Sequence, residues 1–259
     1  MVMETQTMIV MKFGGASVAT PECFHRIAEI IASRKESSIV VIVSAMANAT
    51  DQFIHLAKQV HSSPPPRELD MLISVGERIS ISLLAMALAL KGIEAVSFTG
   101  SQSGILTDER HTEAKIVDVR PARILEALKE KKVIIVAGFQ GVSRGREITT
   151  LGRGGSDTSA VAMAAALKVS CVDFYKDVDG IYNSDPKING SAKKMETMEY
   201  FEAMELAKKG AKVLHLRSLI LAQKNGVQLR VRSFYTPETI GTTVGEGPLK
   251  ETTMYEEEI

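Results

Sequence analysis

Three stretches of this 259-residue sequence combine turn residues with charged side chains. They are "KFGGAS" at 12–17, "LGRGGSDTS" at 151–159 and "YKDVDGIYNSDPK" at 175–187. We place each of them at the end of a strand in a predicted open α/β sheet. Ligands of such sheets bind beyond the carboxyl ends of the strands, so these stretches are the first candidates for chemistry.

The first stretch could bind an anion. Gly14 and Gly15 would let backbone N–H groups approach a ligand closely, and Lys12 would add a mobile positive charge. The alternative is a tight strand–helix turn that carries a surface lysine, and this stretch alone does not decide between the two.

The second stretch leads into an apolar, helical segment. Gly154 and Gly155 would expose amides at the start of that helix, which is a favourable place for an anion. Ser156 or Asp157 is predicted to be the N-cap residue, and capping alone would be sufficient reason for Asp157. Arg153 favours a binding site, because a cap needs no guanidinium and an arginine can bind a carboxylate through two parallel hydrogen bonds.

The third stretch is either a polar loop or part of the same site. Its aspartates do not have the spacing of an EF-hand calcium loop. The sequence also lacks the P-loop, the dinucleotide-binding GxGxxG, the protein-kinase motifs, zinc-ligand spacing and the GxSxG nucleophile turn. Phosphoryl transfer needs mainly positioning, cations and amides, so the residues alone indicate an anion or phosphate site in an α/β sheet.

The elements that must position these stretches alternate along the chain. Continuous apolar runs predict buried strands, and amphipathic segments between them predict helices. The predicted strands lie at 7–15, 37–45, 94–98, 133–139, 170–178 and 227–234. The predicted helices lie at 20–35, 50–61, 67–91, 120–132, 199–209 and 212–225, with another directly after the second stretch. This order predicts a three-layer α/β/α fold with a mostly parallel sheet.

Composition narrows the function classes. Lysine plus arginine equals aspartate plus glutamate at 31 each, so no overall field favours nucleic acid or a membrane. Cys23 and Cys171 are predicted to be buried, reduced thiols. The N-terminus does not resemble a signal peptide, and the apolar run Ile79–Leu90 is too short to span a bilayer, so we expect a cytoplasmic protein. The acidic end "YEEEI" is predicted to be solvated.

Five motifs occur in the order found in aspartokinases of the amino-acid kinase superfamily. They are "MKFGGASV", "SVGERIS", "TLGRGGSDTSAVAMAAAL", "KDVDGIYNSDPK" and "GAKVLH", and the resemblance covers about residues 8–245. It implies ATP-dependent phosphorylation of the β-carboxylate of L-aspartate to 4-phospho-L-aspartate, the first step toward lysine, threonine and methionine. The alternatives are a kinase for glutamate, N-acetylglutamate or carbamate, and a non-catalytic nucleotide or amino-acid sensor.

The resemblance also implies residue roles. Lys12 would neutralise the transferred phosphoryl group, Lys212 the leaving oxygen, and Asp157 would orient the lysines or the substrate ammonium. Glu77 would pair with that ammonium and Arg153 with a substrate carboxylate, and the other amino-acid contacts would be Ser44 and Thr50. The implied ATP contacts are Lys12, Phe13, Gly14, Gly15, Gly154, Gly155, Lys176, Asp177, Tyr182, Lys187, Lys212 and Val213.

The resemblance implies one catalytic domain at 1–245. Its amino-acid-binding part would span about 1–150, its nucleotide-binding part about 151–245, and a short acidic tail 246–259. Mg²⁺ is expected on the ATP phosphates without a dedicated protein site, and the chain is expected to form a homodimer. No ACT regulatory domain fits after the last predicted strand, so we expect no built-in inhibition by lysine. Two departures from the family pattern are Lys176, where threonine is frequent, and Leu216, where proline is usual.

Overall fold

A computed structural model of the chain describes residues 8–34, 38–186, 188–246 and 254–256. Its centre is an eight-stranded sheet, in which six neighbouring strands from β13 to β3 are parallel and β14 is antiparallel to β13. The strands in spatial order are β12 (Thr197–Glu199), β14 (Ile240–Glu246), β13 (Gln228–Ser233), β9 (Cys171–Lys176), β1 (Met8–Phe13), β2 (Ser38–Val43), β6 (Val133–Ala137) and β3 (Ala95–Phe98).

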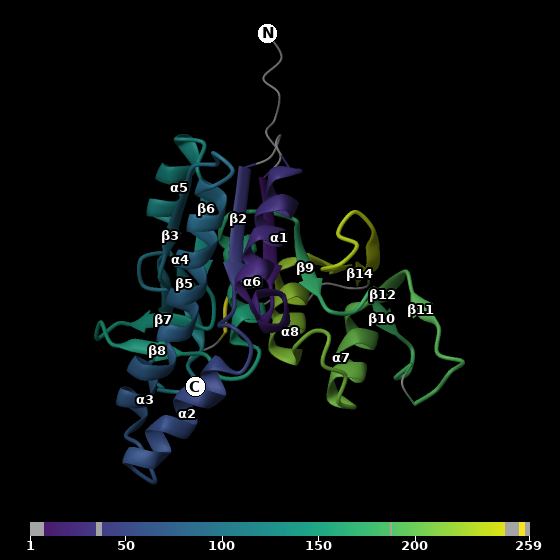
Figure 1. Cartoon of the computed structure of the whole chain (residues 1–259). Helices are drawn as coiled ribbons and strands as arrows, with labels where there is room; N and C mark the ends of the chain where they lie inside the picture. The colour runs from purple at the N-terminus through teal and green to yellow at the C-terminus, as the bar shows by residue number, and fades with distance from the viewer. Residues whose placement is uncertain (1–7, 35–37, 187, 247–253, 257–259) are drawn as a thin grey trace.

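Helices cover both faces of this sheet, as its continuously apolar strands require. On one face, Met11 and Val41 pack with α1 (Pro21–Ala32) and α4 (Val75–Ala89). Figure 1 shows these two helices lying across the strands. On the other face, Val10 and Ile42 belong to a core with α5 (Ala122–Lys129), α6 (Gly155–Ala166), α7 (Tyr200–Lys208) and α8 (Leu216–Asn225). The predicted α/β/α fold with a mostly parallel sheet is confirmed.

The segment predicted as one helix over 67–91 forms two helices, α3 (Pro66–Ile73) and α4. They are separated at Ser74, whose carbonyl accepts a hydrogen bond from the Gln140 side chain at 2.8 Å. By length and composition alone the stretch Pro66–Ala89 could cross a membrane, but half of its apolar 18-residue segment is buried inside the protein. Core helices often pass the same test, so this is weak evidence for a membrane span.

Several short elements were not predicted. A second, four-stranded sheet has the order β5-β4-β7-β8 and lies beside α3 (Figure 1). Its strands are β5 (Ile116–Val119), β4 (Ile105–Thr107), β7 (Gln140–Ser143) and β8 (Ile148–Thr150), and β10 (Ile181–Tyr182) pairs with β11 (Lys194–Met195) elsewhere. Helix α2 (Ala49–Val60) matches its prediction, whereas α8 begins at Leu216 rather than at 212.

The predicted solvated tail is wrong for the part that the structure describes. The Glu256 carboxylate accepts hydrogen bonds from Arg217 at 2.8 and 2.9 Å and from the Ile116 amide at 2.8 Å. Tyr255 packs against the core, which explains why a mostly acidic end is held in place. Cys23 and Cys171 are free thiols and only half-buried, so the prediction that they are buried is wrong in degree.

Candidate functional site

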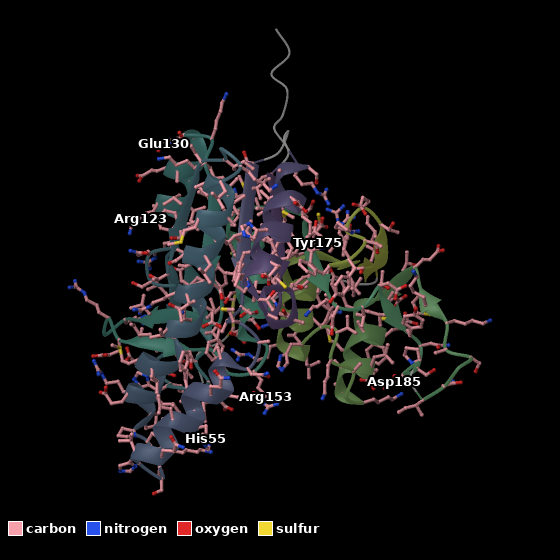
Figure 2. All side chains as sticks on the ribbon, viewed as in Figure 1. His55, Arg123, Glu130, Arg153, Tyr175 and Asp185 are labelled. Atoms are coloured by element: carbon pink, nitrogen blue, oxygen red, sulfur yellow. The ribbon has the colours of Figure 1, made fainter. Side chains whose placement is uncertain are left out.

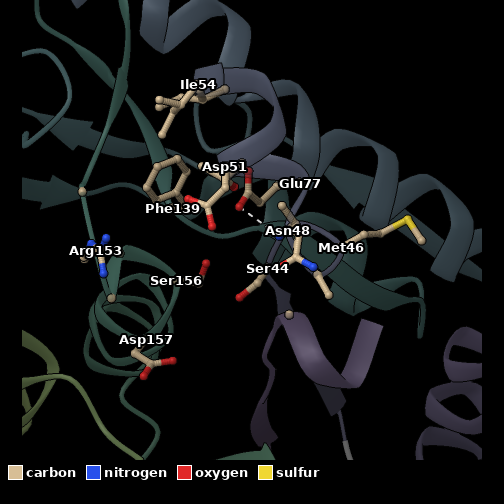
Figure 3. Close-up of a pocket in the computed structure, with 18 of the residues that line it drawn as sticks. Ser44, Met46, Asn48, Asp51, Ile54, Glu77, Phe139, Arg153, Ser156 and Asp157 are labelled. Atoms are coloured by element: carbon tan, nitrogen blue, oxygen red, sulfur yellow. Dashed lines mark hydrogen bonds between the residues drawn. The ribbon is translucent and has the colours of Figure 1, made fainter. Parts of the chain in front are cut away.

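A cavity of about 590 Å³ lies beyond the carboxyl ends of β1 and β2 and at the start of α6 (Figure 3). Nine of the predicted site residues line it, namely Lys12, Gly15, Ser44, Thr50, Glu77, Arg153, Gly154, Gly155 and Asp157. The cavity therefore brings together residues from three of the five motifs, and Ser44 and Thr50 from outside them, although they are far apart in the sequence.

A buried ion cluster forms one wall of the cavity. Lys12 shares its face of β1 with Val10, which is the face that α6 covers, and its Nζ contacts Oδ1 of Asp157. Lys176, at the end of β9, reaches Oδ2 of the same carboxylate at 3.1 Å. Lys12 and Asp157 are only 4% and 5% exposed, so two ammonium groups share one carboxylate with little water around them.

These contacts set the protonation of the cluster. Burial alone would raise the pKa of Asp157, but Lys12 and Lys176 outweigh it and lower that pKa to about 2. Burial lowers the pKa of Lys12 to about 8, because the attraction of Asp157 only partly offsets it and Lys176 repels the charged form. Asp157 is thus ionised at neutral pH, and the cluster carries excess positive charge toward the cavity.

The glycine turn before α6 is shaped by two left-handed residues. Gly152 and Gly154 have φ angles of 71° and 74°, and a Cβ on Gly154 would lie 2.0 Å from Cγ of His215. Only glycine fits at position 154, because both the φ angle and this contact exclude a side chain. The N-cap residue of α6 is therefore Gly154. The predicted capping by Ser156 or Asp157 is wrong, since Asp157 lies inside the first turn and its carboxylate binds the lysines instead.

Arg153 stands between these glycines, is exposed and borders the cavity (Figure 3). Figure 2 shows it at the lower end of the sheet, opposite Glu130 at the upper end. No hydrogen bond or ion pair of its guanidinium occurs within the described part of the chain. It is therefore available to an anion that enters the cavity.

Glu77 faces the cavity from the first turn of α4 and is 2% exposed. Its Oε1 accepts a hydrogen bond from the Ala45 amide at 2.9 Å, whereas its buried Oε2 has no partner among the residues that the structure describes. Burial raises the pKa of Glu77 to about 8, against the lowering effect of the Ala45 amide. A buried acceptor without a donor costs free energy, and a cationic or N–H-bearing ligand would satisfy it.

The predicted glycine contacts divide into two cases. Gly15 lines the cavity, whereas a Cβ on Gly14 would lie 3.3 Å from the Lys12 ammonium. Gly14 has an extended backbone, so we attribute the glycine there to room for that lysine. The Phe13 side chain is fully buried and stacks on Tyr175 at 4.5 Å, so it cannot touch a ligand in the cavity.

Most of the predicted nucleotide contacts do not line this cavity. Lys176 joins it through Asp157, but Asp177 is exposed in the turn after β9, and the Tyr182 hydroxyl donates to Asp179 at 3.1 Å. Lys212 is exposed and Val213 packs on the core, both in the segment between α7 and α8. Lys187 lies outside the described residues. The nucleotide roles of these residues stay predictions.

Sequence reasoning missed several cavity residues. Asn48, Asp51, Glu113, Phe139 and Ser156 all border the cavity. Asn48 and Phe139 have φ angles of 62° and 66°, which is unusual without glycine and marks sharp turns after β2 and β6. The flanking glycine in "AGFQG" was an available signal for the second turn.

Within the described ranges, no group of three or more His, Cys, Asp or Glu residues could hold a metal ion. The Asp157 carboxylate, which borders the cavity, is bound by two lysines. The arrangement suits anions held by cations and amides, with a separate acidic position at Glu77.

Comparison with known proteins agrees with this geometry. The aspartokinase of Mycobacterium tuberculosis is 50% identical over 250 residues, which are 95% of this chain and 59% of that protein. The aspartate kinase from Synechocystis has a similar structure, with a TM-score of 0.85, 41% identity, and coverage of 97% of this chain and 42% of the other.

A second solved structure is E. coli aspartokinase III in complex with aspartate and ADP, with a TM-score of 0.81 and 28% identity. The match covers 94% of this chain and 65% of that one. The chain thus spans less than two thirds of the length of each of these three proteins. The sequence model of the amino acid kinase family matches residues 7–233, which is most of the chain. The chain therefore belongs to the amino acid kinase family.

Proposed function

We propose that this chain carries the catalytic centre of an aspartate kinase, which transfers the γ-phosphoryl group of ATP to the β-carboxylate of L-aspartate. The observation that supports it most is the distribution of charge in one cavity. Oε2 of Glu77 and the Arg153 guanidinium, neither of which has a partner among the described residues, border the same space as the lysine-bound Asp157. Aspartokinases from several bacteria, including one with bound aspartate and ADP, are similar to this chain.

The amino acid fits this distribution group by group. Its ammonium would donate to Oε2 of Glu77, which has no other donor within the described residues. One carboxylate would accept a bidentate pair of hydrogen bonds from Arg153. A substrate without a free ammonium, such as N-acetylglutamate or carbamate, would leave Glu77 unsatisfied, so Glu77 favours a free amino acid.

Phosphoryl transfer to a carboxylate requires charge neutralisation rather than a general base. The acceptor carboxylate is already ionised at neutral pH, so no proton has to leave it. Lys12, held by Asp157 and shielded from water, would neutralise charge on the transferred phosphoryl group. The amides of Gly154 and Gly155, at the start of α6, would add further stabilisation, because helix N-termini attract anions.

We propose further that Mg²⁺ arrives bound to ATP as part of the substrate. Magnesium commonly binds through substrate phosphates with one or two carboxylates, and the described residues offer no larger acidic cluster. The role of Lys212 at the leaving oxygen, homodimer assembly, a cytoplasmic location and the place in lysine, threonine and methionine synthesis stay predictions from the resemblance.

A hydroxamate assay tests this proposal, because an acyl phosphate reacts with hydroxylamine. We expect turnover with L-aspartate to exceed turnover with glutamate, N-acetylglutamate and carbamate. Arg153→Ala should raise KM for aspartate about 10- to 100-fold, since a hydrogen bond to a charged group is worth about 1.5–3 kcal/mol. The control Arg120→Ala removes an exposed arginine that pairs with Asp118 and should change little.

Three results would contradict the proposal. Higher turnover with another acid would identify a different kinase of the same fold. ATP binding without turnover at saturating aspartate and Mg²⁺ would favour a sensor. An unchanged KM for aspartate in Arg153→Ala would refute the assignment of the carboxylate site.

A further inference from the structure

Another buried carboxylate, besides Asp157 and Glu77, lies behind the cavity wall and joins three separate segments. Asp70, on α3, is fully buried. Its two oxygens accept the Thr112 amide at 3.1 and 3.0 Å. Oδ1 also accepts the Thr150 hydroxyl at 2.5 Å, and Oδ2 lies 2.8 Å from Nδ1 of His111. Both carboxylate oxygens are thus used to hold other segments against α3.

Thr112 is held in an unfavourable conformation. Its φ angle is 69°, in the left-handed region that a β-branched residue rarely adopts. Such backbone persists only where the surroundings impose it, and these positions often serve function. The two hydrogen bonds that the Thr112 amide donates to Asp70 are the contacts that impose it here.

The Thr112 turn forms part of the cavity wall. Thr112 and Glu113 border the cavity themselves. Gly152 lies directly against them, because a Cβ there would be 3.1 Å from the Thr112 carbonyl oxygen and 3.4 Å from Cγ of Glu113. Since Gly152 precedes Arg153, a shift of the Thr112 turn would move the backbone that carries this guanidinium.

A second connection leads to the same place. The hydroxyl that donates to Asp70 belongs to Thr150, two residues before Gly152. The Thr150 carbonyl accepts the Ala114 amide at 2.9 Å, so the end of β8 and the Thr112 turn are also bonded to each other. Asp70 therefore fixes both backbone segments that meet behind Arg153, namely the Thr112 turn and the end of β8.

We infer that Asp70 is a positioning residue for the amino-acid end of the cavity. It holds Thr112 in the left-handed conformation and thereby sets where Arg153 stands, without bordering the cavity itself. It should determine affinity for the amino acid much more than affinity for ATP, because its contacts lead to Arg153 and none of them reaches Lys12 or Lys176. The identity of the amino acid rests on the proposed function.

The variant Asp70→Asn keeps the size of the side chain but removes its charge and one acceptor oxygen. We expect KM for aspartate to rise about 10- to 100-fold, the range that a misplaced binding group produces. The kcat value and KM for ATP should stay within about twofold, as measured at saturating co-substrate. The matched control is Glu68→Gln, which removes an exposed carboxylate two residues away on the same helix.

Thr112→Gly separates positioning from a general structural role. Glycine adopts a positive φ freely, so it no longer needs Asp70 to hold it there. In the Thr112→Gly background, Asp70→Asn should therefore raise KM for aspartate by less than about threefold. The free energies of unfolding in urea should be coupled in the same way across the wild type, the two single variants and the double variant. Asp70→Asn should destabilise the wild type more than it destabilises Thr112→Gly.

Several outcomes would overturn the inference. These are an unchanged KM for aspartate in Asp70→Asn, an equal rise in KM for ATP, and the same effect in both backgrounds. Failure of the proposed function would be recognised separately, as absence of aspartate turnover in the unmodified protein. In that case additive unfolding energies would refute the coupling of Asp70 to Thr112, and non-additive energies would support it without any substrate.

Discussion

Replacing Asp157 by asparagine removes the carboxylate that Lys12 and Lys176 share. The amide keeps the size of the side chain but cannot neutralise Lys12 or Lys176. We expect the variant to fold with a lower free energy of unfolding at neutral pH. The reason is that ammonium groups in a poorly solvated site depend on this carboxylate for their stability.

The size of the effect follows from the protonation of Asp157. Its pKa falls from 3.8 to about 2 on folding, and each pKa unit corresponds to about 1.4 kcal/mol, so the charge contributes about 2 kcal/mol. Loss of a buried partner often costs about 3–5 kcal/mol. We expect a loss of about 2 kcal/mol rather than about 3–5 kcal/mol, because Lys12 already has a pKa of about 8 and can release its proton once Asp157 is gone.

The dependence on pH is a sharper test than the loss itself. Because the pKa of Asp157 is lower in the folded protein, its stabilising effect is complete above 3.8 and is lost as the pH falls toward 2. Urea unfolding of the wild type and the variant should differ by about 2 kcal/mol at pH 7, and by about half of that at pH 3.

The control Glu130→Gln removes an exposed ion pair with Lys132 at the end of the sheet far from Arg153 (Figure 2). It should change the free energy of unfolding much less than Asp157→Asn does, because exposed ion pairs contribute little to stability. Equal stability of wild type and Asp157→Asn at pH 7 would refute the reasoning, as would a difference that stays constant from pH 7 to pH 3.

Two further substitutions test the other walls of the cavity. In the wild type, kcat/KM for aspartate should rise between pH 6.5 and 8 as Glu77 becomes ionised. In Glu77→Gln we expect a lower kcat/KM that no longer rises over this range. A rise that persists in the variant would assign the pH dependence to another group. Gly154→Ala should destabilise the fold by about 3 kcal/mol or more in urea unfolding, through strain plus the clash with His215. Its control is Gly92→Ala, at a φ of 69° with nothing within 4 Å, which should cost about 1 kcal/mol; equal losses would refute the clash.

The centre of the main sheet could be predicted because β1, β2, β6 and β9 are buried on both faces, whereas the strands β12 and β14 at one edge were not predicted. Runs such as "IVMKF" and "IVVIV" are apolar at every or nearly every position, which distinguishes them from the amphipathic helices between them. The four-stranded sheet was missed because strands of three or four residues, such as Ile148–Thr150, carry too little periodicity to recognise. The break at Ser74 was also missed, and the Gln140 side chain that donates to the Ser74 carbonyl is 66 residues away in the sequence.

The candidate site was predictable in its residues but not in its contacts. Lys12, Glu77 and Arg153 could be named from the motifs, and all three border one cavity. The resemblance left open whether Asp157 orients the lysines, and only the folded chain shows its carboxylate between them. The cap was predicted at Ser156 or Asp157 because local sequence reveals neither the left-handed backbone of Gly154 nor the His215 side chain that leaves no room for a Cβ there.

Glu77 and Asp157 show why residue type alone does not fix chemistry. Both carboxyl groups are almost completely buried, yet their pKa values are about 8 and about 2. The difference arises because two ammonium groups contact Asp157, whereas one amide hydrogen bond reaches Glu77. At neutral pH a cation that binds at Glu77 must therefore displace a proton, whereas the charge of Asp157 is already in place. Binding of the proposed amino acid should release protons in proportion to the protonated fraction of Glu77, and calorimetry in buffers of different ionisation enthalpy would measure that release.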